Sequence, residues 1–183
     1  LTRWSASGQP IESYQLSQQS LRSLAFCAER NEIAVGSSDG HIYLLDATHF
    51  TIKRVLERAH RQSVFKVVYA PNGDYLLSGG RDAHLNIWLT DQDYQLHSSR
   101  PAHLFTINDI CYAPHGRYFA TASRDKTLKI WDARSFELLK VIETVRDNGH
   151  INSVNTLYWS AYCDYLLSAG DDRSIIVWQI GER

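Results

Sequence analysis

The chain has 183 residues, of which 44% are hydrophobic and 21% charged, and its net charge is −1. This length allows one sizeable hydrophobic core but is short for two full domains. Proteins that bind nucleic acid regardless of sequence are normally strongly basic, so the charge disfavours that class, and no apolar run approaches the roughly 20 residues that span a membrane.

Aromatic residues, with 10 Tyr, 6 Phe and 5 Trp, favour strands over helices. Cys27, Cys111 and Cys163 lie far apart and form no CxxC pair. An odd number of cysteines argues against a disulfide framework, so we expect free thiols in a reducing compartment and a cytoplasmic protein. The sequence begins at Leu1 inside an expected strand and without a signal-peptide pattern, which predicts a fragment of a longer chain.

The first expected element is incomplete. Trp4 is expected to close the third strand of an earlier unit, and residues 11–16 are expected to form that unit's fourth, outer strand. Residues 17–58 then form a degenerate unit, with a turn at 27–31.

The unit at 59–101 shows the strand order most clearly. Strands are predicted at residues 63–70, 75–79, 84–89 and 94–98, the last of them frayed. The motif Pro-Asn-Gly-Asp at 71–74 predicts the turn between the first two strands.

Two more units follow, at 102–145 and 146–183, with corresponding turns at 114–117 and 161–164. The last unit stops at the end of its third strand, near Ile180, without a fourth. No segment shows the apolar period of a helix.

Polar residues recur at fixed offsets in the last three units. In each, a Trp lies six residues after an Asp, a His lies 22 residues before that Asp, and a hydroxyl residue lies four before it. The position of the Trp recurs with periods of 43, 43 and 47 residues when Leu45 is counted as its first occurrence. Periods near 40–45 with four strands each are typical of propeller blades.

These motifs resemble the WD40 family from about residue 17 to 180. Only Trp131-Asp132 is a literal Trp-Asp pair, and a Gly precedes the His only at Gly149-His150. The resemblance implies an all-β, WD40-type β-propeller with four four-stranded blades, part of a larger ring of about seven. It also implies a protein-interaction scaffold that is not an enzyme.

The residue types Ser, His and Asp permit two hypotheses. One makes Ser78, His60 and Asp82 a hydrolase triad. The other joins them to Trp88 in a structural network, which is the tetrad that the resemblance implies. A catalytic triad has no reason to occur three times at equal spacing or to exchange Ser for Thr, so the structural hypothesis is favoured. The expected tetrads are His60, Ser78, Asp82 and Trp88; His103, Thr121, Asp125 and Trp131; and His150, Ser168, Asp172 and Trp178.

The first unit has lost three tetrad members, because Ser17, Val35 and Leu45 stand in their places, and we expect it to be the softest blade. No His pairs with a Cys or another His at ligand spacing, and no Gly-rich phosphate loop is present, so neither a metal nor a cofactor is expected. The remaining histidines are expected on the solvated surface: His41, His49, His84, His97 and His115.

In the WD40 family, partner contacts lie three and five residues after the tetrad His and just before the tetrad Asp. The corresponding positions are Ser63, Phe65 and Arg81; Thr106, Asn108 and Arg124; Ser153, Asn155 and Asp171; and, in the first unit, Ser20, Arg22 and Ser38. Arginines and aromatic residues are frequent at binding hot spots, so the set predicts an acidic or phosphorylated peptide on the wide face. The alternatives are arginines that pair only with neighbouring carboxylates, a phosphoinositide or nucleic-acid binder, and an enzyme that uses the central cavity.

Four blades leave unpaired edges and uncovered faces. Two arrangements remain open. Either missing N-terminal blades complete the ring, which is the favoured origin, or two copies form a homodimer. In the homodimer, residues 11–16 of each copy would pair with residues 175–180 of the other in an eight-bladed ring.

Overall fold

The computed structural model describes residues 2–180, and Leu1 lies outside these limits. Within them the chain forms five antiparallel sheets and one short helix. Three of these sheets have four strands, one has three and one has two. The all-β class and the propeller architecture expected from the sequence are confirmed.

The two-stranded sheet comes first. It pairs β1 (Thr2–Trp4) with β2 (Pro10–Ser13), so that Trp4 lies opposite Pro10. The strand expected at 11–16 therefore begins one residue earlier and ends sooner. Trp4 ends a strand as expected. That the hairpin corresponds to the third and fourth strands of an earlier blade stays a prediction.

Each blade is a meander in which consecutive strands pair. The first blade contains β3 (Leu21–Cys27), β4 (Glu32–Ser37), β5 (Ile42–Asp46) and β6 (Ile52–Leu56). The second contains β7 (Val64–Tyr69), β8 (Tyr75–Gly80), β9 (His84–Leu89) and β10 (Gln95–Pro101). The third contains β11 (Ile107–Tyr112), β12 (Tyr118–Ser123), β13 (Leu128–Asp132) and β14 (Leu138–Ile142). The fourth contains β15 (Val154–Trp159), β16 (Tyr165–Gly170) and β17 (Ile175–Gln179).

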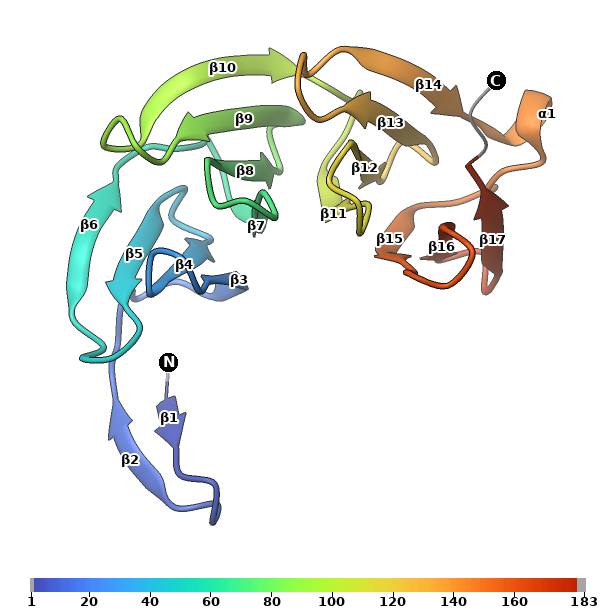
Figure 1. Cartoon of the computed structure of the whole chain (residues 1–183). Coiled ribbons are helices and arrows are strands. Elements are labelled where there is room, and N and C mark those ends of the chain that lie inside the picture. The colour runs from blue at the N-terminus through green and yellow to red at the C-terminus, as the bar shows by residue number, and fades with distance from the viewer. Residues whose placement is uncertain (1, 181–183) are drawn as a thin grey trace.

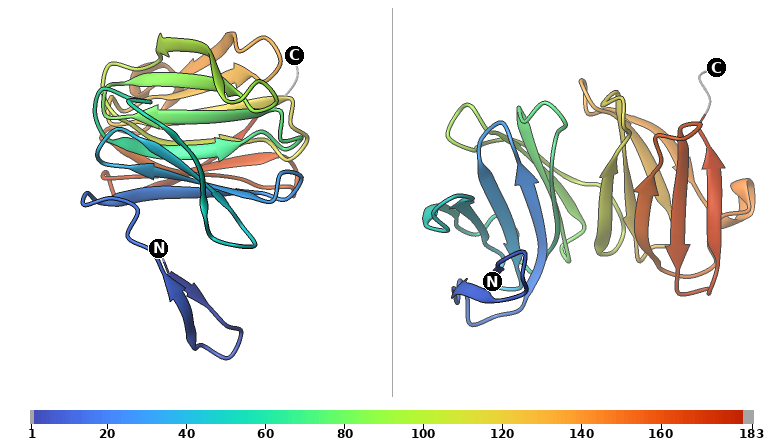
Figure 2. Two further views of the ribbon diagram at one scale, coloured as in Figure 1. Left: turned by 90° about the vertical axis from the view of Figure 1, so that its left-hand side faces the viewer. Right: turned by 60° about the horizontal axis from the view of Figure 1, so that its bottom comes forward.

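The blades form an arc with β3, β7, β11 and β15 on its inner side and β6, β10 and β14 on its outer side (Figure 1). The hairpin extends one end of the arc and projects away from the stacked blades (Figure 2). The three-stranded blade forms the other end, and the two ends do not meet in Figure 1. No helix among the described residues is long and apolar enough to cross a membrane.

Apolar clusters fill the spaces between neighbouring blades. Leu44 of the first blade belongs to the same buried cluster as Val67 and Trp88 of the second. Leu77 of the second blade shares a cluster with Trp131 of the third, and the third and fourth blades are joined in the same way. Each tetrad Trp thus packs toward the preceding blade, which explains why strand segments in the middle of the chain are apolar on both faces.

Two details differ from the sequence prediction. The fourth strand of the second blade runs over seven residues, Gln95–Pro101, and is longer than the frayed strand expected. A single helical turn, α1 (Thr144–Asp147), lies between the third and fourth blades where no helix was expected. Four residues are too few to show a helical period, so the pattern could not reveal it. The proposed blade boundaries at 58/59, 101/102 and 145/146 stay predictions.

Candidate functional site: the blade networks and the two faces

The three regular blades each contain a hydrogen-bonded chain of four side chains. In the second blade, His60 Nδ1 lies 2.9 Å from Asp82 Oδ1, and His60 Nε2 lies 2.8 Å from Ser78 Oγ. The Trp88 indole N–H donates to the same Ser78 Oγ at 3.0 Å. The second carboxylate oxygen of Asp82 accepts the backbone N–H of Arg61. The network therefore ties an inter-blade loop to the inner strands of the blade.

The other two networks repeat this geometry. The His–Asp distance is 2.9 Å in all three blades, and the distance from His to the hydroxyl oxygen is 2.7 or 2.8 Å. In both, the indole N–H donates to the hydroxyl oxygen. The members are His103, Thr121, Asp125 and Trp131 in the third blade and His150, Ser168, Asp172 and Trp178 in the fourth.

The burial of these groups bears on the hydrolase hypothesis. The His60 side chain is 0% exposed, and Ser78 is also 0% exposed. The Ser78 hydroxyl lies between an imidazole and an indole. A nucleophile must have room for a substrate beside it, and this hydroxyl has none. The arrangement favours a structural clamp over a catalytic triad.

The first blade replaces the network with a smaller one. Ser17 Oγ donates to Asp39 Oδ2 at 2.6 Å, and the Tyr43 hydroxyl donates to the same oxygen at 2.9 Å. Val35 and Leu45, which have the places of the hydroxyl and the indole, are buried in an apolar cluster with Tyr43. The blade thus keeps a bonded Asp without the His. Its lower stability stays a prediction.

The network holds its carboxylates in the charged form. Burial acts to raise the pKa of Asp82, but the hydrogen bond and charge of His60 and the N–H groups of Arg61 and His84 outweigh burial and lower the pKa to about 2. The pKa of Asp125 is lowered in the same way.

Burial also acts on the imidazole of the third blade. Burial lowers the pKa of His103 because it disfavours the charged form, and the neighbouring Asp125 only partly offsets this effect. His103 is therefore held neutral between its two hydrogen-bond partners.

The wide-face residues predicted from the sequence lie in related positions on successive blades. In each blade, the residue just before the tetrad Asp, or before Asp39 in the first blade, donates its backbone N–H to a carbonyl at the start of the first strand. The accepting residue lies three positions after the tetrad His, or after Ser17 in the first blade. These pairs are Ser38 and Ser20, Arg81 and Ser63, Arg124 and Thr106, and Asp171 and Ser153. In each blade, the turn between the second and third strands therefore lies beside the start of the first strand.

Several members of this set contact one another. Arg22 Nε donates to Ser38 Oγ at 2.7 Å, and its guanidinium lies 5.4 Å from the centre of the Phe65 ring. Asn155 donates to the Asp171 carboxylate at 2.5 Å. These side chains therefore already form contacts with one another within the chain.

The Asn108 amide donates to the Val154 carbonyl at 2.8 Å and so links the third blade to the fourth. Thr106 and Ser153 are buried. Neither offers a surface that a partner could reach.

Arg81 and Arg124 differ from the rest. Both are exposed, and neither guanidinium forms an ion pair or hydrogen bond within residues 2–180. The arginines therefore do not pair with neighbouring carboxylates in this structure.

Sequence reasoning missed a buried carboxylate, Glu32, at the opposite, narrow end of the first blade. The Tyr69 hydroxyl donates to Glu32 Oε1 at 2.8 Å, the Tyr94 hydroxyl donates to the same oxygen, and Lys53 Nζ lies 3.0 Å from Oε2. The other blades carry Tyr at the position of Glu32, so a comparison of the repeats could have singled it out.

A second missed carboxylate, Asp109, lies on the inner strand β11. Lys66 Nζ of the second blade contacts Asp109 Oδ1 at 2.8 Å, while Thr156 Oγ1 and Leu157 N of the fourth blade donate to Oδ2 at 3.1 and 2.7 Å. Asp109 joins three blades on the inside of the arc. All of its contacts are within the chain, which indicates a structural role.

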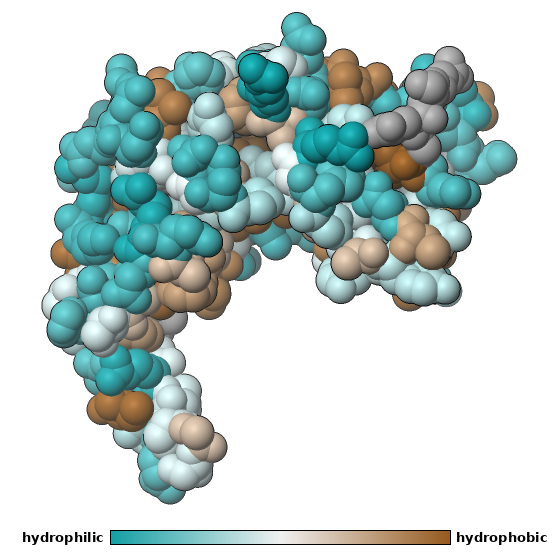
Figure 3. Space-filling model, in the orientation of Figure 1, coloured by the Kyte–Doolittle hydropathy of each residue, from teal (hydrophilic) through white to brown (hydrophobic). Residues whose placement is uncertain are grey.

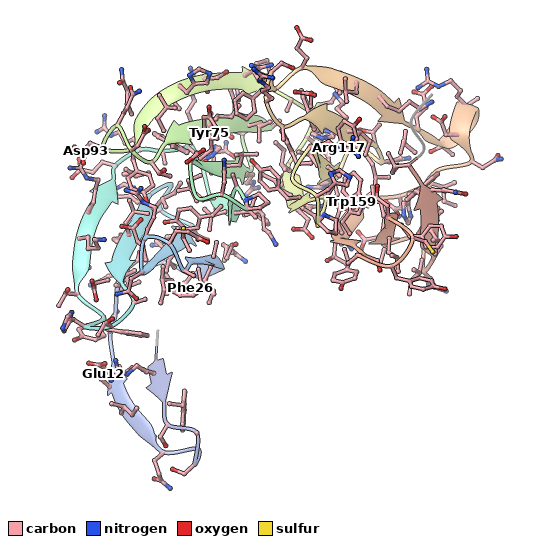
Figure 4. All side chains as sticks on the ribbon, in the orientation of Figure 1. Glu12, Phe26, Tyr75, Asp93, Arg117 and Trp159 are labelled. Atoms are coloured by element: carbon pink, nitrogen blue, oxygen red, sulfur yellow. The ribbon has the colours of Figure 1, made fainter. Side chains whose placement is uncertain are left out.

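A pocket of about 690 Å³ opens between the second and third blades on the narrow side. Aromatic residues Tyr75, Tyr112 and Tyr118 line it together with Arg117 and Arg134. Tyr75 and Arg117 are labelled on these two blades in Figure 4. No group of three or more His, Cys, Asp or Glu side chains within residues 2–180 is arranged to hold a metal ion.

Stacked blades, each clamped by the same buried network, define a repeat protein of the β-propeller class that presents loops on two faces. The model of the family described as WD domain, G-beta repeat matches residues 8–46, 50–88, 94–132 and 139–179. The chain belongs to this WD40 family. Each matched segment begins in or near the outer strand of one sheet and ends with the third strand of the next.

Curated relatives match parts of the chain. Cilia- and flagella-associated protein 43 of Xenopus laevis is 36% identical over 46% of this chain and 5% of its own length. Probable cytosolic iron-sulfur protein assembly protein 1 of Kluyveromyces lactis is 28% identical over 82% of the chain and 34% of its own length. The 26S proteasome regulatory subunit RPN14 of Saccharomyces cerevisiae is 33% identical over 30% of the chain and 13% of its own length. The chain thus spans about a third or less of each relative that it matches.

We expect Thr121→Val to lower the free energy of unfolding by about 1–3 kcal/mol, because His103 and Trp131 lose a buried hydrogen-bond partner. Thr121→Ser should cost much less, since Ser has this place in the other two tetrads. Urea unfolding followed by tryptophan fluorescence measures both. An equal loss for the two variants would show that the methyl group, and not the hydroxyl, stabilises the blade; Thr51→Val, at an exposed position, is the control.

We also expect acid to weaken the fold in two stages. The native pKa of His103 lies below its ordinary value, so stability is lost as the pH falls below about 6.5. The native pKa of Asp82 is about 2, so its stabilising effect is complete above about pH 4 and is lost as the pH falls through 2. Asp82→Asn should reduce the dependence below pH 4, and urea midpoints at several pH values would show it. Asp74→Asn, in an exposed turn, should leave the profile unchanged.

Proposed function

We propose that the chain is part of a non-catalytic WD40 scaffold whose wide face binds an acidic or phosphorylated segment of a partner protein. The observation that carries this proposal is the pair Arg81 and Arg124, which occupy equivalent turns on adjacent blades and keep exposed guanidinium groups without partners in the described chain. Arginine forms bidentate hydrogen bonds with carboxylate and phosphate groups, so two in a row favour an extended anionic ligand.

The surroundings of these arginines support a specific site over a general anion surface. Phe65 is half-buried beside Arg22 and offers an apolar contact next to Arg81. Asp171 in the fourth blade places a negative charge at the corresponding turn, which limits the cationic stretch to the middle blades. The net charge of −1 supports a protein ligand over nucleic acid.

The names of two relatives also support a non-catalytic scaffold. One is named for iron–sulfur protein assembly and one is a regulatory subunit of the proteasome, and neither name describes an enzyme. The former is named as cytosolic, which supports the cytoplasmic location expected from the cysteines.

We further propose that the scaffold needs additional blades to cover both ends of the arc. On the open face of the first blade, Leu24 is 62% and Phe26 58% exposed, whereas their equivalents Val67 and Tyr69 are 0% and 7% exposed. The surface view shows brown atoms at the inner end of the first blade and on the hairpin, within a largely hydrophilic face (Figure 3).

The last blade shows the same effect on its open face. Ile175 is 74% and Val177 56% exposed, while the equivalent Leu85 and Ile87 are fully buried. Burying one such side chain contributes about 1.5–3 kcal/mol. Both ends are therefore suited to contact with a further blade, from a longer chain or from a second copy.

The hairpin limits how a second copy could close the ring. One edge of β2 pairs with β1, so β2 can pair with β17 of another copy through that same edge only where β1 gives up its pairing. This requirement favours completion by further blades of the same protein over the homodimer.

The wide-face proposal is tested by Arg81→Glu combined with Arg124→Glu. We expect capture of acidic or phosphorylated peptides from an array to fall at least tenfold, since two attractive contacts become repulsive. The circular dichroism spectrum and melting temperature should stay within a few degrees of the parent because both side chains are exposed. Arg54→Glu, a charge reversal on the outer strand β6, is the control, and undiminished capture by the double variant would refute the proposal.

Ring completion is tested by Val177→Asp together with Leu24→Asp. Light scattering coupled to size exclusion should give a mass near twice the 20.9 kDa monomer if copies associate through these ends, and the double variant should be monomeric. A monomeric parent chain would rule out the homodimer. If a longer form carrying preceding blades were no more stable to urea, completion by further blades would also be wrong.

A further inference from the structure

We propose that the narrow-side pocket between the second and third blades binds a protein segment through an Asp or Glu side chain, whose carboxylate accepts a hydrogen bond from the Tyr112 hydroxyl. This site lies on the face opposite Arg81 and Arg124 and does not depend on the wide-face proposal.

One pair of positions recurs at each of the three blade junctions among the described residues. The last aromatic residue of the inner strand faces the first residue of the second strand in the preceding blade. At the first junction these are Tyr69 and Glu32, at the second Tyr112 and Tyr75, and at the third Trp159 and Tyr118. The junctions therefore provide an internal comparison with the same backbone and different side chains.

A carboxylate satisfies the polar hydrogen at two of the three junctions. The Tyr69 hydroxyl donates to Glu32 at 2.8 Å, and the Trp159 indole N–H donates to Asp164 Oδ1 at 2.8 Å. The Tyr112 hydroxyl is buried and has no hydrogen-bond partner. Tyr75 replaces the carboxylate of the first junction, and among residues 2–180 no acidic group forms a hydrogen bond with the Tyr112 hydroxyl.

The junction with the unsatisfied hydroxyl also borders a pocket. Tyr112 lines this pocket of about 690 Å³, a size that suits a ligand of a few residues. Burial raises the pKa of the Tyr112 hydroxyl, so it keeps its proton and can act as a donor. A buried donor without an acceptor is unfavourable, and a ligand that supplies an acceptor removes this cost.

The charges around the pocket allow an acidic ligand. The Arg134 guanidinium is exposed and forms no ion pair within the described residues. Asp74 and Asp132 also line the pocket. Asp74 accepts a hydrogen bond from the Asn72 amide at 2.5 Å. Asp132 Oδ1 accepts the N–H groups of Arg134 and Ser135 and the Ser135 hydroxyl. Its charge is thus partly neutralised by its own turn.

Access requires one local change. The Tyr112 hydroxyl has almost no surface open to water, so the ligand must displace a side chain at the rim. Arg134 is exposed on the turn that borders the pocket, and its long side chain can change rotamer at little cost.

The test uses the chain itself and a display library of short peptides with one central Glu, alongside the same library with Gln at that place. We expect the chain to retain Glu peptides and not their Gln counterparts. Tyr112→Phe should weaken the binding of a selected peptide by about tenfold or more, the effect of one hydrogen bond to a charged group. Arg134→Glu should weaken it as well.

Tyr69→Phe is the matched control, because it removes a hydroxyl from the equivalent position of the first junction. It should lower the melting temperature, since Glu32 loses a donor, and leave peptide binding unchanged. Tyr112→Phe should keep or raise the melting temperature, because the hydroxyl it removes has no partner. A large drop in melting temperature for Tyr112→Phe would contradict an unsatisfied hydroxyl.

The remaining outcomes separate this site from others. Equal retention of the Glu and Gln libraries, or unchanged binding in Tyr112→Phe, would overturn the proposal. Loss of Glu peptides in the Arg81→Glu, Arg124→Glu variant would assign them to the wide face instead. Binding of free glutarate without any peptide would identify a small-molecule site and refute a protein segment as occupant.

Discussion

Each blade of this protein is a thin sheet with two apolar faces, and a sheet of this kind is stable only when both faces are covered. Residues such as Leu44, Leu76 and Ile87 are fully buried because a neighbouring blade lies against them. At the ends of the arc, Val177, which has the position of Leu44 and Ile87, and Leu24, which has the position of the buried Val67, are exposed. Stability in such a stack is the sum of blade and interface terms, so the uncovered ends determine which partners the chain requires.

Apolar faces alone do not fix the angle between an inter-blade loop and the strands beneath it. The His–hydroxyl–Trp chain does so, because each of its hydrogen bonds has a direction and every partner is buried. Asp82 extends the chain to the backbone of the loop by accepting the N–H groups of Arg61 and His84. The turn that begins with Arg81 is thereby held in place while its side chain stays exposed.

Regular spacing made much of this structure predictable. The second-blade strand at His84–Leu89 has the bounds expected, and the strands that carry the tetrad residues follow the predicted order. Trp4 also indicated the end of a strand, β1. The pattern did not reveal single departures from the repeat. The helix α1 is too short to have a period. Glu32 is a carboxylate where the other blades carry Tyr, and Asp109 is one where they carry Ser, Lys or Thr.

These departures matter because repeats share a backbone and therefore share the demands of each position. A tyrosine hydroxyl at a blade junction needs an acceptor wherever it occurs, and Glu32 supplies one to Tyr69. Where the sequence replaces the acceptor with Tyr75, the Tyr112 hydroxyl still needs an acceptor. Either a ligand supplies this acceptor or the hydroxyl stays unsatisfied. In a repeat protein, comparison with the equivalent positions of the other repeats thus shows which unsatisfied group lacks a partner that the other repeats provide. The recurring tetrads hold the scaffold together, and the positions that break the repeat indicate where it can contact something else.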